Sequence, residues 1–158
     1  MPNKTLQMKS LFLASIVLLV SMVLTACGGG SAQTTPTSAI TVITAAPGVA
    51  VLNIATNAKL GKILVTGTGV TLYQFKLDTP GVTVCLSTCS ATWPPLISKD
   101  APVLASPDIK GKVGIMTRPD GTQQVTYNDL PLYYFTLDTR PGDTSGNGYG
   151  GNWAVVVP

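Results

Sequence analysis

The sequence predicts a mainly β protein: a single small antiparallel β domain built from two sequence repeats of period 60, with short turns and at most one short helix. Three observations lead to this fold class. Short segments rich in β-branched and aromatic residues alternate with turns that contain Gly and Pro. Beyond the N-terminal segment, no stretch is long enough to carry a helical period. Two stretches match each other without a gap, 60 residues apart.

Residues 1–26 have the layout of an export signal. Lys4 and Lys9 precede an apolar run of 14 residues, which is shorter than the roughly 20 that cross a bilayer. The end of this segment, Leu24-Thr25-Ala26-Cys27, resembles the bacterial lipobox, at which the signal is cut and the cysteine is acylated. We therefore expect lipidated Cys27 to anchor the protein outside the cytoplasm, on the cell membrane or the outer membrane. An ordinary cleaved signal with a chance cysteine is the alternative.

Residues 27–48 then form the lipidated cysteine and a linker that is rich in Gly, Ser, Thr, Ala and Pro and has no charge. Such a composition buries little apolar surface and predicts a flexible tether. The β-rich domain is expected over 49–158, with repeats at about 61–98 and 121–158. Ten identical pairs lie in the 33 aligned positions, and the only two tryptophans, Trp93 and Trp153, form one of them. Two half-domains that share one core explain a repeat of this length.

Residue content and turn signals predict seven strands, at 51–55, 62–66, 71–76, 113–117, 123–127, 132–136 and 154–157. Residues 89–93 are long enough for one helical turn, which Pro94 and Pro95 would end.

Composition excludes several function classes. The chain has no His, and all seven acids are Asp. Hydrolases with a His base and metal sites with His ligands are therefore excluded, and we expect no cofactor and no metal. Of the ten Lys and Arg, eight remain after the export signal, so the formal charge of the rest is +1. This charge predicts no nucleic-acid partner.

Cys85 and Cys89 are the thiols left after lipidation, and outside the cytoplasm such a pair usually forms a structural disulfide. A redox-active dithiol is the alternative, although the spacing differs from the C-x-x-C of thioredoxin-like proteins. Without a gap, the second repeat places Ser145 and Tyr149 at these positions.

Aromatic residues recur at strand spacing in both repeats, and an aspartate follows each pair. Each aromatic pair lies on one face of its strand and is expected to fill the core, a stacking platform for a ligand being the alternative. Each aspartate is expected to accept hydrogen bonds from turn N–H groups two residues on, rather than to flank a substrate. The residues are Tyr73, Phe75 and Asp78 in the first repeat and Tyr133, Phe135 and Asp138 in the second.

The loop from Asp143 to Gly148 copies the first half of an EF-hand loop, but Ala154 stands where a bidentate Glu is needed. The sequence leaves open whether this loop binds a cation.

The strings LYQFKLD and LYYFTLD, the segment CLSTCSATWPPL and the C-terminal DTRPGDTSGNGYGGNWAVVVP together resemble a bacterial family of secreted repeats of unknown function. These lipoproteins carry a Tyr-x-[Phe/Trp/Tyr]-x-x-Asp motif. The resemblance covers about 61–158 and implies a lipoprotein with a duplicated β architecture. It implies no activity.

These observations predict a non-catalytic, membrane-anchored envelope protein that binds an unknown envelope ligand or has a structural role. An envelope thiol-disulfide redox protein that uses Cys85 and Cys89 is the alternative, and an Asp-based hydrolase comes third. The ligand and the oligomeric state cannot be inferred from the sequence.

Overall fold

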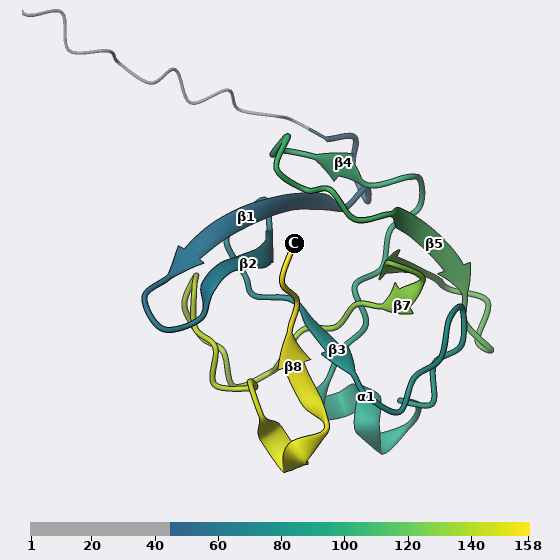
Figure 1. Ribbon diagram of the computed structural model, residues 1–158. Helices are drawn as coiled ribbons and strands as arrows, with labels where there is room; N and C mark the ends of the chain where they lie inside the picture. The colour runs from purple at the N-terminus through teal and green to yellow at the C-terminus, as the bar shows by residue number, and fades with distance from the viewer. Residues whose placement is uncertain (1–44) are drawn as a thin grey trace, which may run out of the picture. The chain divides into compact units, whose positions relative to one another are not determined.

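The computed structural model describes residues 45–158, which fold mainly into strands (Figure 1). The predicted export signal, Cys27 and most of the predicted linker lie outside the described residues. No helix in the described part is long and apolar enough to cross a membrane. The elements in chain order are β1 (Val51–Asn57), β2 (Gly61–Thr66), β3 (Tyr73–Phe75), α1 (Thr88–Thr92), β4 (Val103–Leu104), β5 (Val113–Thr117), β6 (Gln123–Tyr127), β7 (Leu130–Pro131), the 3-10 turn η1 (Tyr149–Gly151) and β8 (Trp153–Val155).

The strands form three small sheets, in the orders β2-β1-β4, β3-β8 and β5-β6-β7. All strand pairs are antiparallel except β1 with β4. Local chemistry fixes the turns of hairpins β1–β2 and β5–β6. Asn57 Oδ1 accepts hydrogen bonds from the N–H groups of Lys59 and Leu60, and Asp120 Oδ1 accepts one from Thr122 N–H. The predicted antiparallel β fold with one short helix is confirmed.

The repeat is visible in the element order, because β1 and β2 each begin 62 residues before β5 and β6, close to the period of 60. The short helix α1 and the turn η1 occupy equivalent places in the two repeats. In Figure 1, the two hairpins lie on either side of the β3–β8 pair, with α1 below it.

The C-terminal segments of the two repeats are exchanged. In the second repeat, β8 pairs with β3 of the first, and Val156 N–H donates to Leu72 O. In the first repeat, Leu96 N–H donates to Leu132 O of the second, and Tyr134 N–H donates to Pro94 O. The last segment of each repeat therefore bonds to the other repeat, which explains why two copies are needed for one core.

Two strand predictions need correction. The predicted strand 132–136 is not a regular strand, although it is equivalent to β3. Its partner segment contains Pro94 and Pro95, which have no N–H, so the ladder is reduced to an isolated bridge between Pro95 and Tyr133. The neighbouring β7 pairs with β6 instead. The two-residue strand β4 was not predicted, because its place depends on pairing with β1 rather than on its own sequence.

The core consists of two clusters. The first is mainly aliphatic and contains Leu52, Leu64, Leu72, Leu96, Ile109, Val125, Tyr127, Leu132 and Val156. The second is aromatic and contains Tyr73, Cys85, Trp93, Tyr133, Phe135 and Trp153.

Candidate functional site

The motif residues of both repeats meet in the aromatic cluster, where four rings form one stack. Trp93 and Trp153 lie parallel, with centroids 3.7 Å apart and an interplanar angle of 3°. Phe135 stacks on Trp93 at 4.2 Å, and Phe75 stacks on Trp153 at 4.4 Å. The exchange of C-terminal segments creates this order, because each tryptophan comes from one repeat and its phenylalanine from the other. Trp93, Trp153 and Phe135 are buried in the aromatic cluster, and Phe75, which is partly buried, packs against it.

The two tyrosines stand edge-on to the stack and bond to the opposite repeat. Tyr73 Oη donates to Asp138 Oδ2 at 2.5 Å, and Tyr133 Oη donates to Asp78 Oδ2 at 2.6 Å. The backbones of the two tyrosines also exchange hydrogen bonds, 2.9 and 3.0 Å long. The motif Tyr and Asp therefore form two reciprocal pairs across the interface of the repeats.

Each aspartate also caps its own loop through Oδ1. Asp78 accepts a hydrogen bond from Val84 N–H, and Asp138 accepts one from Ser145 N–H. These donors lie six and seven residues on, rather than the two expected for a simple turn. Each motif carboxylate thus joins the opposite tyrosine to its own loop.

Burial governs the ionisation of this cluster. Burial and the hydrogen bond to a carboxylate raise the pKa of both Tyr73 and Tyr133 far above the usual value, so both phenols remain proton donors. Burial also raises the pKa of Asp78, against the opposing effect of its hydrogen bonds to Tyr133 and Val84 N–H. These shifts follow from a packed interior and need no catalytic role.

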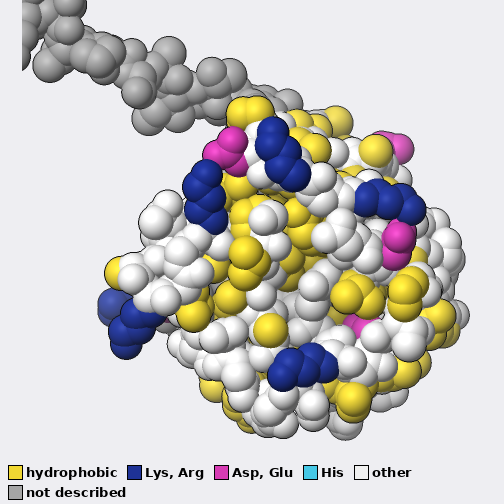
Figure 2. Space-filling view, in the orientation of Figure 1, with side chains coloured by type: hydrophobic (Ala, Val, Ile, Leu, Met, Phe, Trp, Pro, Cys, Tyr) yellow, Lys and Arg dark blue, Asp and Glu magenta, His cyan; other side chains and the backbone are white. Residues whose placement is uncertain are grey.

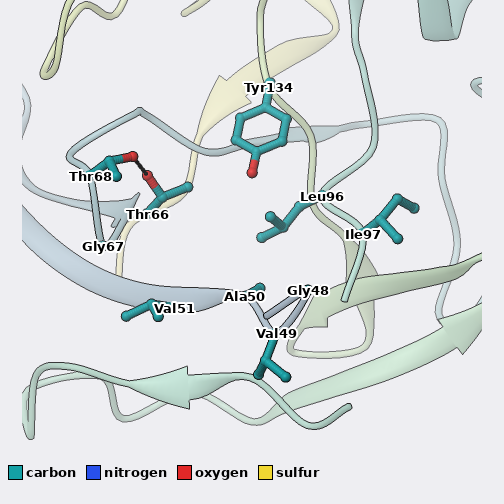
Figure 3. A pocket seen from close by; sticks show the side chains of 10 residues that line it. All are labelled: Gly48, Val49, Ala50, Val51, Thr66, Gly67, Thr68, Leu96, Ile97 and Tyr134. Atoms are coloured by element: carbon teal, nitrogen blue, oxygen red, sulfur yellow. Dashed lines mark hydrogen bonds between the residues drawn. The ribbon is translucent and has the colours of Figure 1, made fainter. Parts of the chain in front are cut away.

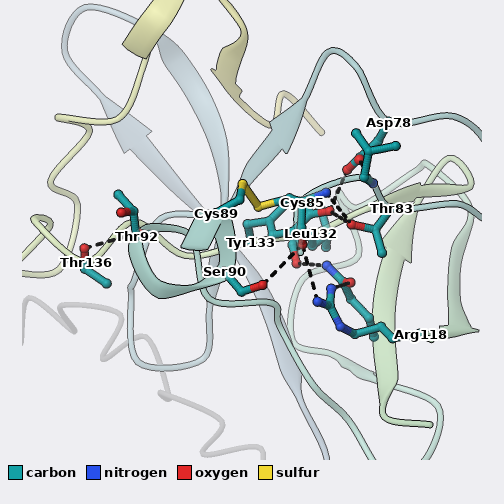
Figure 4. Close-up of a disulfide and its surroundings, with 12 residues drawn as sticks. Asp78, Thr83, Cys85, Cys89, Ser90, Thr92, Arg118, Leu132, Tyr133 and Thr136 are labelled. Carbon is teal, nitrogen blue, oxygen red and sulfur yellow. Dashed lines mark hydrogen bonds between the residues drawn. A yellow bond between two sulfur atoms is a disulfide. The ribbon is translucent and has the colours of Figure 1, made fainter. Parts of the chain in front are cut away.

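Cys85 and Cys89 form a disulfide, with Cα atoms 5.1 Å apart (Figure 4). Cys85 is fully buried in the aromatic cluster, and Cys89 packs against it. Beside it, Thr83 Oγ1 lies 2.6 Å from Tyr133 Oη and accepts a hydrogen bond from Cys85 N–H. The crosslink therefore fixes the loop that supplies contacts to Tyr133.

A buried arginine, which the sequence analysis did not single out, lies under this loop (Figure 4). Arg118 Nη1 donates to Gln124 Oε1 at 2.5 Å, and its Nη2 donates to Cys85 O at 3.4 Å. Gln124 Nε2 in turn donates to Leu132 O. No sequence signal marks Arg118, because its burial depends on how the β5–β6 hairpin packs.

The structure changes the alignment of the two loops. The capping donors show that Ser145, rather than Thr144, takes the place of Val84, so the second loop has one extra residue before this point. Gly146, rather than Ser145, then corresponds to Cys85. A Cβ on Gly146 would lie 2.7 Å from the Trp93 ring, which explains why glycine stands there.

The oxygen atoms of the loop from Asp143 to Gly148 are used by the chain itself. Asp143 Oδ2 accepts hydrogen bonds from Thr139 N–H and Arg140 N–H, and Asn147 Oδ1 accepts one from Val155 N–H. Within 45–158, no group of three or more His, Cys, Asp or Glu side chains is placed to hold a metal ion.

A pocket of about 450 Å³ lies beside the start of β1 and is separate from the motif residues (Figure 3). Its apolar walls include Val51, Leu96 and Ile97. The Tyr134 hydroxyl points into it and has no hydrogen-bond partner among the described residues, while the hydroxyls of Thr66 and Thr68 bond to each other at 2.9 Å. Burial raises the pKa of Tyr134. Sequence reasoning missed this residue, which occupies a variable position of the second motif.

Comparison with known proteins identifies one family. A family model described as a secreted repeat of unknown function matches residues 55–97 and 114–157, together more than half of the chain. No curated protein and no solved structure matches the chain. The match confirms the resemblance found in the sequence, identifies the two repeats and indicates a secreted protein. The chain belongs to this family of secreted repeats of unknown function.

Proposed function

We propose that the protein is a non-catalytic binding module, held on the outer side of a membrane by lipidated Cys27. One observation carries the non-catalytic part: the motif side chains bond and stack with one another inside the fold. Both oxygens of Asp78 are used, and both tryptophans are buried. A motif used in this way stabilises a scaffold and leaves binding to other surfaces.

We place the ligand in the pocket beside β1. Its lining residues carry no charge, and its volume lies within the roughly 300–1,000 Å³ of small-molecule sites. The Tyr134 hydroxyl offers one directed hydrogen bond among aliphatic walls. This chemistry fits an uncharged, partly apolar component of the envelope that carries a hydrogen-bond acceptor.

The alternatives have less support. Cys85 is fully buried, which hinders attack by an external thiol. The Asp78 carboxylate is also buried and both of its oxygens are engaged, which hinders contact with a substrate. On the face in Figure 2, Lys and Arg side chains are scattered singly, which supports the proposal that nucleic acid is not a partner.

Metabolic labelling with a fatty acid tests the anchor. The parent chain should incorporate the label, and Cys27→Ser should lose both the label and the processed size. Equal labelling of both chains would refute lipidation at Cys27.

Retention of small molecules tests the pocket. The protein is incubated with the fraction of an envelope extract below 1 kDa, and bound molecules are identified by mass spectrometry. Tyr134→Phe should weaken retention about fivefold, as expected for one lost hydrogen bond. Thr68→Trp, which fills the pocket from an exposed position, should abolish retention, whereas the exposed Ser145→Ala should leave it unchanged. Retention that none of these variants alters would refute the pocket as the site.

A further inference from the structure

The loop that carries the disulfide exposes a row of aliphatic side chains. Val82, Val84 and Leu86 are 52%, 55% and 38% exposed, whereas the residues between them, Thr83 and Cys85, are buried. Leu77, in the same loop, is 58% exposed. We call Val82, Val84 and Leu86 the 82–86 face. Clusters of exposed apolar side chains usually mark a surface that contacts something else.

The second repeat provides an internal control for this face. With the loops aligned by their capping bonds to Asp78 and Asp138, the positions of the 82–86 face hold Asp143, Ser145 and Asn147. The same fold therefore accepts polar residues at these places. Folding does not explain the apolar residues of the first repeat, since exposed aliphatic groups add no core packing there.

The backbone of this loop is already largely bonded within the molecule. The N–H groups of Val82, Val84 and Leu86 donate to Thr79 O, to Asp78 Oδ1 and to Val84 O. An added β-strand would need free backbone groups at alternate residues, so the 82–86 face presents side chains rather than a sheet edge. Three aliphatic side chains also expose far less than the ~800 Å² per partner of a stable protein interface.

A bilayer needs neither backbone groups nor a large complementary area. Within 77–89, Asp78 is the one charged residue, and it is turned inward onto Tyr133 (Figure 4). The anchor position, Cys27, lies 22 residues before Val49, so a tethered domain would remain near the lipid surface throughout. Weak contacts suffice at such proximity, because the tether raises the effective concentration of the surface.

We propose that the 82–86 face inserts into the interfacial region of the lipid bilayer and orients the domain on the membrane. Val82, Val84 and Leu86 enter the acyl-chain boundary, and the disulfide and the Asp78 cap hold them in one rigid loop. This proposal rests on the proposed anchoring, which keeps the domain near the bilayer. The insertion itself is the burial of apolar side chains in the bilayer, and Cys27 takes no part in it.

Quenching by brominated lipid tests the contact. Full chains carrying Val84→Trp or, as the matched control, Leu104→Trp are reconstituted into phosphatidylcholine vesicles with brominated acyl chains. Trp93 and Trp153 are 3% and 5% exposed and give a common background. The indole introduced at position 84 should be quenched at least twofold more than that at 104, with emission shifted to the blue. Equal quenching at both positions, or quenching replaced by concentration-dependent self-association, would overturn the proposal.

A loop exchange tests the residues. In the full chain with Cys27, Leu77→Trp places an indole in the same loop as a reporter. Adding Val82→Asp, Val84→Ser and Leu86→Asn gives the first loop the residues at the equivalent positions of the second; this should leave the melting temperature unchanged and lower the quenching of this indole by the brominated lipid at least twofold. Adding instead Leu104→Ser, Leu137→Ser and Val157→Ser, which remove exposed aliphatic groups elsewhere, should leave the quenching unchanged. Unchanged quenching after the loop exchange would overturn the proposal. Fatty-acid labelling of Cys27 is measured separately, so a missing anchor and a missing face contact give different results.

Discussion

Asp78 and Asp138 are equivalent in sequence but differ in their surroundings. Asp78 is buried, and its partner Tyr133 has a second acceptor nearby, Thr83 Oγ1. Asp138 is partly exposed, and among the described residues Tyr73 Oη has no acceptor besides it. The sequence suggests that the two sites respond alike to substitution, whereas these contacts predict a difference.

We expect Asp78→Asn to melt close to the parent, because Asn Nδ2 can donate to Tyr133 Oη while the Tyr133 hydroxyl turns to Thr83 Oγ1. Asp138→Asn should lower stability by about 1 kcal/mol, since Tyr73 then loses its acceptor. Asp78→Ala should lower the free energy of unfolding by about 1 kcal/mol more than Asp138→Ala, because it leaves Val84 N–H without a partner near a buried site. Denaturant unfolding of the four variants measures these changes. Four parent-like curves would show that the reciprocal pairs do not stabilise the fold.

The raised pKa of Asp78 also predicts a pH dependence. Such a carboxyl, whose pKa is higher in the folded than in the unfolded chain, stabilises the fold most at pH values below the unfolded pKa of about 3.9. Its contribution decreases as the pH rises through the folded pKa. The melting temperature of Asp78→Asn should therefore rise relative to the parent between pH 4 and neutral pH.

Asp108 is a control of opposite sign. Lys62 lowers the pKa of its carboxyl, so Asp108→Asn should lose stability relative to the parent as the pH rises over the low-pH range. A difference between Asp78→Asn and the parent that does not change with pH would contradict burial as the cause of the Asp78 shift.

At the scale of elements, the two equivalent loops use different means to close over the stack. The first loop has the Cys85–Cys89 disulfide, and the second has Gly146 beside Trp93, with Tyr149 packed on Phe135 at 5.3 Å. The packing of Tyr149 holds the second loop against the stack, as the disulfide holds the first loop. This difference explains why one repeat lacks cysteines without losing the loop.

We expect intact mass to be two daltons below that of the dithiol form. Reduction should lower the free energy of unfolding by about 2 kcal/mol, the chain-entropy value for a loop of this size. Mass spectrometry with and without reductant, followed by denaturant unfolding, measures both. Cys27→Ser, which leaves this pair intact, should show the same shift on reduction. Two free thiols in the exported protein would contradict the structural role.

At the scale of the whole molecule, the exchanged segments make the two repeats one cooperative unit. The stack, the tyrosine–aspartate pairs and the terminal strands all join residues of different repeats. Each tryptophan stacks on the phenylalanine of the other repeat, so one repeat alone cannot form this contact. Unfolding should therefore be a single transition rather than two.

Fragment complementation tests this dependence. Chains ending at Pro107 and beginning at Asp108, a cut between the repeats, should each lack the near-ultraviolet circular dichroism of the tryptophan stack. An equimolar mixture should recover it, because the missing segments are then supplied in trans. A signal of native strength in either fragment alone and monomeric would contradict the exchange.

Sequence alone determined the fold class, the repeat and the chemistry that the chain lacks. Five-residue strands such as β5 and β6 were predicted with their exact bounds, since alternation and turn residues are local signals. The disulfide followed from compartment and cysteine number. Only the tertiary structure decided the pairing of each motif tyrosine with the opposite aspartate, the burial of Arg118, the extra residue in the second loop and the pocket at Tyr134. The tyrosine–aspartate pairs join segments about 50 residues or more apart, and Arg118 and the pocket depend on burial by other elements. The extra loop residue shows only in which N–H group each aspartate caps. Sequence patterns instead report the preferences of neighbouring residues.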